Sequence, residues 1–171
     1  MENWTYVKNT DNTARFTLGK MGRRNLFVIG INPSTAEPNN LDNTVNKVEK
    51  FAFNNGYDGW IMLNVYPQRA TDPKFIHKEV DISIHNENLK QLAILIQSNP
   101  DFDIWAGWGT LINKRPFLKT CLKEVVEVLG VNRNWLNLNE LTKHGHPRHP
   151  LYLPYNSVFN PFDVSNYLNS Y

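Results

Sequence analysis

Four polar or glycine-rich stretches of the sequence hold most of the side chains that could carry chemistry. They are Asn32–Thr35, Asn64–Asp72, Gly107–Thr110 and Thr142–His149. Each follows an apolar run that is short enough to be a buried strand. Because the carboxyl ends of parallel strands lie at one edge of a sheet, the four stretches predict a single cleft at that edge.

The side chains in and beside these stretches are of three kinds that suit a nucleic-acid ligand. Amides form two-point hydrogen bonds with the edge of a base, aromatic rings stack on bases, and Arg or Lys holds phosphate. The residues concerned are Asn32, Asn64, Gln68, Arg69, Lys143, Arg148, Tyr66, Trp108 and Tyr152. We therefore expect a nucleobase pocket beside a nucleic-acid backbone, with DNA or a nucleotide as the partner.

Three histidines, His144, His146 and His149, raise the question of a metal site. Two prolines interrupt the tract, and no Cys lies close to it in sequence. The spacing is not that of a helical zinc site, so we expect no metal. The chain also lacks the Gly-x-x-x-x-Gly-Lys-Ser/Thr loop, the Gly-x-Gly-x-x-Gly loop and the Gly-x-Ser-x-Gly elbow, and we expect no cofactor.

Composition limits the class of protein. The 171 residues predict one domain, and 41% hydrophobic with 12% aromatic residues suffice for a packed core. A net charge of +2 means that any contact with nucleic acid comes from a local patch. The single cysteine, Cys121, lies in an apolar helical pattern and is expected in the core, in a reducing, cytoplasmic setting. We expect a monomer without a signal peptide or membrane span.

Strands and helices alternate along the chain. Continuous apolar runs predict strands at 25–30, 60–63, 102–106 and 135–138. Helices are expected after the capping residues Asp42, Asn43 and Thr44, over about 84–97 and 111–129, and from Pro161 to Leu168. Residues 1–24 are expected to hold peripheral strands. The order predicts a single α/β domain over 1–171, a three-layer α/β/α sandwich around a mainly parallel four-stranded sheet.

Four motifs carry a resemblance to a known family. They are Asn32–Ala36, Asn64 with Arg69–Pro73, Trp108–Gly109 and Gly145–Tyr152, and they occur in one order over about residues 25–155. Together they resemble the bacterial DUF1643 family. That resemblance implies no activity.

The sequence also has a more distant similarity to the uracil-DNA glycosylase superfamily. The similarity lies in Gly30–Pro33, Leu63–Asn64, Trp108–Gly109, His146–Leu151, and Phe162 with Asn166. It implies a uracil-DNA glycosylase-like fold and a DNA glycosylase that hydrolyses the N-glycosidic bond of an extruded unusual or modified base. A base extruded from the stack exposes a bond that the duplex otherwise hides.

The superfamily resemblance also implies residue roles. Asn32 would position the attacking water, and His146 or His149 would stabilise the leaving base. Asn64 would read the base in a pocket formed with Ser34, Thr35, Tyr66 and Trp108, and Arg69, Lys143, Arg148 and Leu151 would contact the nucleic acid. An amide cannot take a proton from water. Asp42 or Glu37 could supply the missing carboxylate, although Asp42 is equally well explained as a helix cap.

Two alternatives to a DNA glycosylase remain open at this point. One is a non-catalytic module of the same fold that binds nucleic acid or a nucleotide, because Asn32 stands where the most active superfamily members carry Asp. The other is a hydrolase of free nucleosides or nucleotides.

Overall fold

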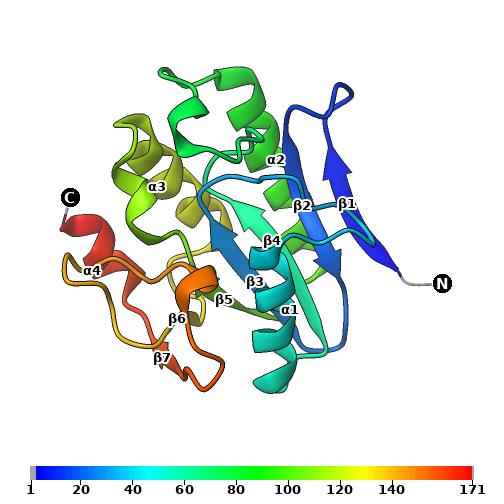
Figure 1. The fold of residues 1–171 in the computed structure, drawn as a ribbon, viewed down its shortest axis with the longest axis vertical. Coiled ribbons are helices and arrows are strands. Elements are labelled where there is room, and N and C mark those ends of the chain that lie inside the picture. Colours follow the sequence, from blue (N-terminus) through cyan, green and yellow to red (C-terminus); the bar gives the residue numbers. More distant parts are fainter. Residues whose placement is uncertain (1–2, 171) are drawn as a thin grey trace.

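The computed structural model describes residues 3–170, which build one seven-stranded sheet in the order β1-β2-β4-β3-β5-β6-β7 (Figure 1). The strands are β1 (Trp4–Lys8), β2 (Arg15–Lys20), β3 (Asn25–Gly30), β4 (Gly59–Asn64), β5 (Phe102–Ala106), β6 (Trp135–Leu138) and β7 (Phe159–Pro161). The four strands β4, β3, β5 and β6 run parallel. The outer strands pair antiparallel on both sides.

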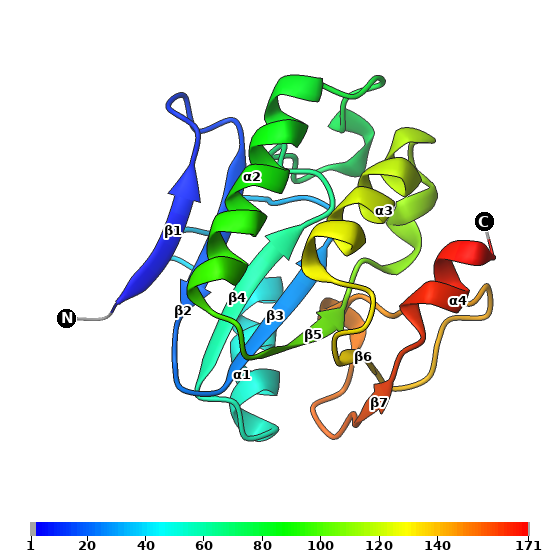
Figure 2. The same cartoon turned by 180° about the vertical axis from the view of Figure 1, so that it is seen from behind.

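Helices cover both faces of the sheet. The helix α1 (Asn43–Asn54) lies on the face turned to the viewer in Figure 1, and α2 (Ile82–Ser98) and α3 (Phe117–Leu129) lie on the opposite face, seen in Figure 2. A short helix, α4 (Val164–Asn169), follows β7. Alternate residues of β3 enter different cores, with Val28 facing α1 and Phe27 facing α2 and α3. Burial on both faces explains why the parallel strands read as continuous apolar runs.

The local sequence fixes where α1 begins, which matters for the site. Asp42 is the N-cap, and its Oδ1 accepts a hydrogen bond of 2.9 Å from the backbone N–H of Val45. Val45, Val48, Phe51 and Ala52 form one buried face. The first turn of α1 is thereby held at the carboxyl edge of the sheet.

The chain passes from β3 to β4 on one side and then crosses back to β5 on the other side of β3. The connection that leaves β3 leads to β4 on one side, and the connection that leaves β5 leads to β6 on the other side, so these two connections diverge at the carboxyl ends of β3 and β5. In open α/β sheets this divergence leaves a crevice that binds ligands.

The extent of the sheet corrects the sequence prediction. The prediction of a four-stranded, mainly parallel sheet is wrong. The parallel strands form only the centre of a mixed seven-stranded sheet. The N-terminal strands β1 and β2 form one edge of this sheet, where Leu18–Lys20 of β2 pairs with β4. The strand β7 has only three residues, too few for a recognisable hydrophobic pattern.

Two predicted helices have different bounds. The helix expected over 111–129 is divided into the 3₁₀ helix η2 (Gly109–Asn113) and α3, with Pro116 as the N-cap of α3. Proline inside a helix removes a backbone hydrogen bond and clashes with the preceding turn. The last helix begins at Val164 behind an Asp163 cap, and Pro161 belongs to β7. Two further 3₁₀ turns are η1 (Pro73–Phe75) and η3 (Pro150–Tyr152).

Within the described residues, no helix has both the length and the apolar character that crossing a membrane requires.

Candidate functional site

A cavity of about 670 Å³ lies at the carboxyl edge of the sheet, at the divergence point of β3 and β5. Its walls come from 30–35 after β3, from 42–45 at the start of α1, and from 70, 71 and 73 after β4. They are completed by 108–111 after β5 and by 142, 148, 149 and 151–153 after β6. All four polar stretches of the sequence therefore contribute to one cavity.

Asn32 lines this cavity and holds two of its loops together. Its Nδ2 donates to three backbone carbonyls, those of Pro33 at 3.0 Å, Gln68 at 3.2 Å and Ala70 at 2.9 Å. Three acceptors on one side fix the orientation of the amide. The Oδ1 atom has no hydrogen-bond partner among residues 3–170, so it remains an acceptor for a ligand or water.

Asp42 and His149 also line the cavity. The Nδ1 of His149 accepts a hydrogen bond of 3.2 Å from the backbone N–H of Leu151. Desolvation lowers the pKa of His149, and Asp42 opposes this shift. His149 is consequently a neutral imidazole at neutral pH whose proton is on Nε2, which makes Nε2 a donor.

A glycine positions His149. Gly109 has a φ of +63°, and a Cβ added there would lie 3.1 Å from the Cβ of His149. Both the left-handed backbone and the close approach require glycine at this position. The Trp108–Gly109 motif therefore acts through the backbone, as the support of His149.

His146 lies outside the cavity. Its Nδ1 is 2.8 Å from the hydroxyl of Tyr167, and its Nε2 is 3.1 Å from Nδ2 of Asn113. Tyr167 also accepts a hydrogen bond of 3.0 Å from Nε1 of Trp108. This network ties α4 to η2, so of the two candidate histidines only His149 reaches the cavity.

The residues expected around a base divide into two groups. Ser34 and Thr35 line the cavity, and Oγ of Ser34 is 2.9 Å from Oγ1 of Thr71. The side chains of Asn64, Tyr66 and Trp108 are fully buried. Of these three residues, only Trp108 is part of the cavity wall.

Asn64 nevertheless lies just behind the cavity. Its Nδ2 donates to the backbone carbonyl of Arg15 at 3.4 Å, and its Oδ1 has no partner among the described residues. That Oδ1 is 3.9 Å from the point where a Cβ on Gly30 would lie. Gly30 and Met62 are both part of the cavity wall, and Cε of Met62 lies 2.7 Å from the same point. The backbone of Gly30 and the side chain of Met62 therefore lie between the amide oxygen and the cavity.

The residues expected to contact nucleic acid also fall into two groups. Arg148 and Leu151 line the cavity, whereas Arg69 and Lys143 do not. The guanidinium of Arg69 donates to the carbonyls of Ser34 and Ala36, to the Tyr6 hydroxyl and to Oδ1 of Asn12. Arg69 is thus committed to holding the loop after β3.

The residue that sequence reasoning missed is Arg15. Its side chain is only 1% exposed and lines the cavity. Nη1 donates to the carbonyl of Ala36 at 2.9 Å, but Nε has no partner among residues 3–170, and no described carboxylate lies within ion-pair distance. Burial, with a smaller effect of Arg69, lowers the pKa of Arg15 to about 10, so the side chain stays charged at neutral pH.

A β-bulge explains how Arg15 reaches the cavity. Val7 pairs with Thr17 and Lys8 pairs with Arg15, which leaves Phe16 as the extra residue. Bulges redirect neighbouring side chains and are frequent beside functional sites. A possible signal in the sequence was an arginine directly before the Phe16–Leu18 alternation, but bulges cannot be read from alternation alone.

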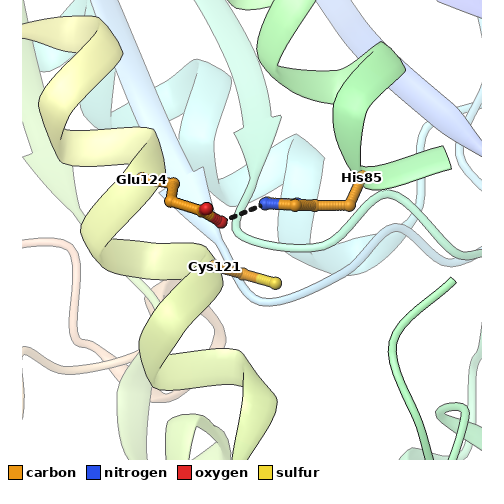
Figure 3. A group of neighbouring side chains, drawn as sticks. All are labelled: His85, Cys121 and Glu124. Atoms are coloured by element: carbon orange, nitrogen blue, oxygen red, sulfur yellow. Dashed lines mark hydrogen bonds and ion pairs between the residues drawn. The ribbon is translucent and has the colours of Figure 1, made fainter. Parts of the chain in front are cut away.

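A second polar cluster lies away from the cavity, between α2 and α3 (Figure 3). Nε2 of His85 is 2.6 Å from Oε2 of Glu124, and the candidate ligand atoms of His85, Cys121 and Glu124 lie within 4.8 Å of one another. Within residues 3–170, this is the one such group. The donor types suit zinc.

Cys121 lies in this cluster beside the His85–Glu124 pair. The cysteine is buried, as the sequence predicted, and burial together with Glu124 raises the pKa of its thiol to about 12. Sequence reasoning missed His85 and Glu124 because they lie 39 positions apart and form no motif.

Comparison with known proteins establishes the family. The model of DUF1643, described as a protein of unknown function, matches residues 15–151. The chain therefore belongs to the DUF1643 family. The matched region begins at Arg15 and includes all the strands that end at the cavity. Searches of curated proteins and of solved structures returned no match.

Proposed function

We propose that this protein hydrolyses the N-glycosidic bond of an unusual or modified base, which it takes from DNA in an extruded conformation as a DNA glycosylase does. The observation that supports the proposal is the convergence of Asn32, Asp42 and His149 on one cavity. These groups can hold a water, take its proton and stabilise a leaving base.

In the proposed reaction, Oδ1 of Asn32 accepts a hydrogen bond from the attacking water. The carboxylate of Asp42 takes the proton as the water oxygen bonds to C1′ and the bond from C1′ to the base nitrogen breaks. The electron pair of that bond moves onto the base. His149 stabilises the resulting charge by donating a hydrogen bond from Nε2.

Asp42 is free to perform this role at one of its oxygens. Its Oδ1 caps α1 through Val45, while Oδ2 has no partner among the described residues. The capping bond holds the carboxylate at the cavity wall. Asp42 therefore supplies the proton acceptor that Asn32 cannot be.

A second candidate function is hydrolysis of free nucleotides. It is supported by the positions of the cationic side chains. Arg69 and Lys143 do not line the cavity, whereas the buried Arg15 does. A cation inside the cavity suits a small anionic substrate as well as a strand that passes across its mouth.

The test is a substrate panel. Single- and double-stranded oligonucleotides that carry uracil, mismatched or hypermodified bases are incubated with the protein and then cleaved with alkali. Free nucleosides and nucleotides are assayed in parallel for released base by mass spectrometry. We expect base release from at least one substrate.

The panel also separates the alternatives. Release from small substrates, without affinity for oligonucleotides, would select the second candidate. Salt-dependent binding of DNA without release of any base would leave a non-catalytic module and would overturn the proposed hydrolysis.

A further inference from the structure

We infer that Arg15 and the N-terminus of α1 form an anion subsite in the cavity, and that its ligand is the phosphate group of a nucleotide. The choice of a nucleotide rests on the proposed function, because phosphate is the anion that accompanies a base and its sugar. The anion site itself rests on the contacts of Arg15.

The first argument is the unpaired charge of Arg15. A buried guanidinium has five N–H groups to satisfy, and the only hydrogen bond that the Arg15 side chain donates within residues 3–170 goes to Ala36. Burying a charge without a counter-ion is costly, and buried arginines are normally paired. A phosphate oxygen supplies both the missing charge and the missing acceptors.

The second argument is the start of α1. This helix has 12 residues, and its first backbone N–H groups, those of Asn43 and Thr44, have no acceptor in the described part of the chain. Both residues line the cavity. Helix N-termini present such donors together with the positive end of the helix dipole, and they bind phosphate for that reason.

The third argument is the charge of the cavity wall. Two arginines line it, Arg15 and Arg148, against one acidic residue, Asp42. The guanidinium of Arg148 also donates to the backbone carbonyls of Glu140 and Leu141. Asp42 opposes the burial effect on Arg15, but it lies beyond ion-pair distance. The wall therefore keeps a net positive charge with one carboxylate available for proton transfer.

The loop after β3 adds neutral donors beside this charge. Ser34, Thr35 and Thr44 line the same cavity, and hydroxyl groups commonly contact phosphate oxygens. Arg69 holds the loop in place through the carbonyls of Ser34 and Ala36. The backbone that carries Ser34 and Thr35 is therefore held in place beside the subsite.

The experiment uses the full-length protein and needs no turnover. Melting temperature is measured in sodium phosphate and in sodium chloride of equal ionic strength. Calorimetric titrations then compare 5′-nucleoside monophosphates with the matching nucleosides, and oligonucleotides that carry or lack a 5′-phosphate. We expect phosphate to raise the melting temperature and at least one nucleotide to bind tenfold or more tightly than its nucleoside.

The variant Arg15→Met removes the cation, and Arg15→Lys retains the charge without the guanidinium fork. We expect Arg15→Met to lose at least tenfold in nucleotide affinity and the whole phosphate effect on melting. The control, Arg133→Met, removes an arginine outside the cavity and is expected to retain both. Equal melting of the wild-type protein in phosphate and chloride, with no preference for any nucleotide over its nucleoside, would overturn the subsite without any use of a variant.

The outcomes distinguish the two proposals. Phosphate-dependent binding without release of any base would retain the subsite and reject the hydrolysis. Release of base at equal rates from nucleosides and nucleotides, unchanged in Arg15→Met, would retain the hydrolysis and reject the subsite. The oligonucleotide arm shows whether the phosphate belongs to a free nucleotide or to a strand.

Discussion

Arg15 and His85 are both buried, and each has a ring or guanidinium nitrogen without a partner in residues 3–170. Their surroundings differ. His85 has a counter-charge, because Glu124 lies 2.6 Å from its Nε2, whereas Arg15 has none within ion-pair distance. Arg15 also lines a cavity, and His85 does not line the one at the sheet edge. A buried group that is paired inside the protein serves the fold, and one that is left unpaired at a cavity is available to a ligand.

The largest expected effect is on the rate of base release at the cavity that Arg15 lines. Asn is as good a helix cap as Asp, so Asp42→Asn preserves the start of α1 and removes only the proton acceptor. We expect the rate of base release to fall by about 100-fold or more, in the range of general-base catalysis. Rates on the best substrate of the panel, measured beside the melting temperature, check this.

An Asp42→Asn variant that releases base at the wild-type rate would exclude Asp42 as the base. A variant with a reduced rate of base release and a much lower melting temperature would show that the loss of the helix cap, and not the loss of the proton acceptor, caused the change.

The second largest effect is expected on stability, at the His85–Glu124 pair. Glu124→Ala leaves His85 without a partner in the α2–α3 interface, and unsatisfied buried groups cost about 1–3 kcal/mol. We expect denaturant unfolding to show a loss of this size with no change in ligand affinity. The matched control is Glu127→Ala, on the exposed side of the same helix, for which we expect no measurable loss. Equal stability of the two variants would contradict a structural role of the pair.

Arg15→Met is expected to change stability by less than Glu124→Ala does, and in the opposite direction. Replacing an unpaired buried charge by an apolar side chain is often neutral or stabilising. We expect the unliganded variant to melt at the wild-type temperature or above it. A large drop in melting temperature would show that Arg15, like His85, serves mainly the fold.

The smallest effect is the pH dependence that His149 adds. Because burial holds its pKa in the folded protein below the usual value of about 6.5, the unfolded chain binds the proton more readily. Stability is therefore complete above pH 6.5 and falls as the pH drops below it. His149→Asn, which can still accept from the N–H of Leu151, should lose less stability than the wild-type protein between pH 7 and pH 5. Identical pH profiles in thermal melts would contradict this.

Much of the fold could be predicted because local signals agree with it. The apolar runs of β3 to β6 and the capping residue Asp42 are explicit in the sequence, and the polar strand ends do meet at one cavity. The edge strands were harder, since β7 is only three residues long and contains a proline. Their positions depend on partners that are distant in sequence.

The candidate site was predictable in its loops and not in its details. Spacing could not show that His149 rather than His146 reaches the cavity, because a hydrogen bond between His146 and Tyr167 holds His146 elsewhere. The position of Arg15 depends on a bulge, and that of Asn64 on the Gly30 backbone in front of it. Such features arise from packing between strands and have no local sequence signal.

The central claim is that a ligand binds beside Arg15 and not at the His85–Glu124 pair. Backbone and arginine side-chain NMR signals, followed during titration with sodium phosphate and then a 5′-nucleoside monophosphate, test it most directly. We predict shifts at Arg15, at Asn43 and Thr44, and in the loop after Gly30, with none at His85 or Glu124. Shifts centred on His85 and Glu124, or an unchanged Arg15 signal at saturating ligand, would contradict it.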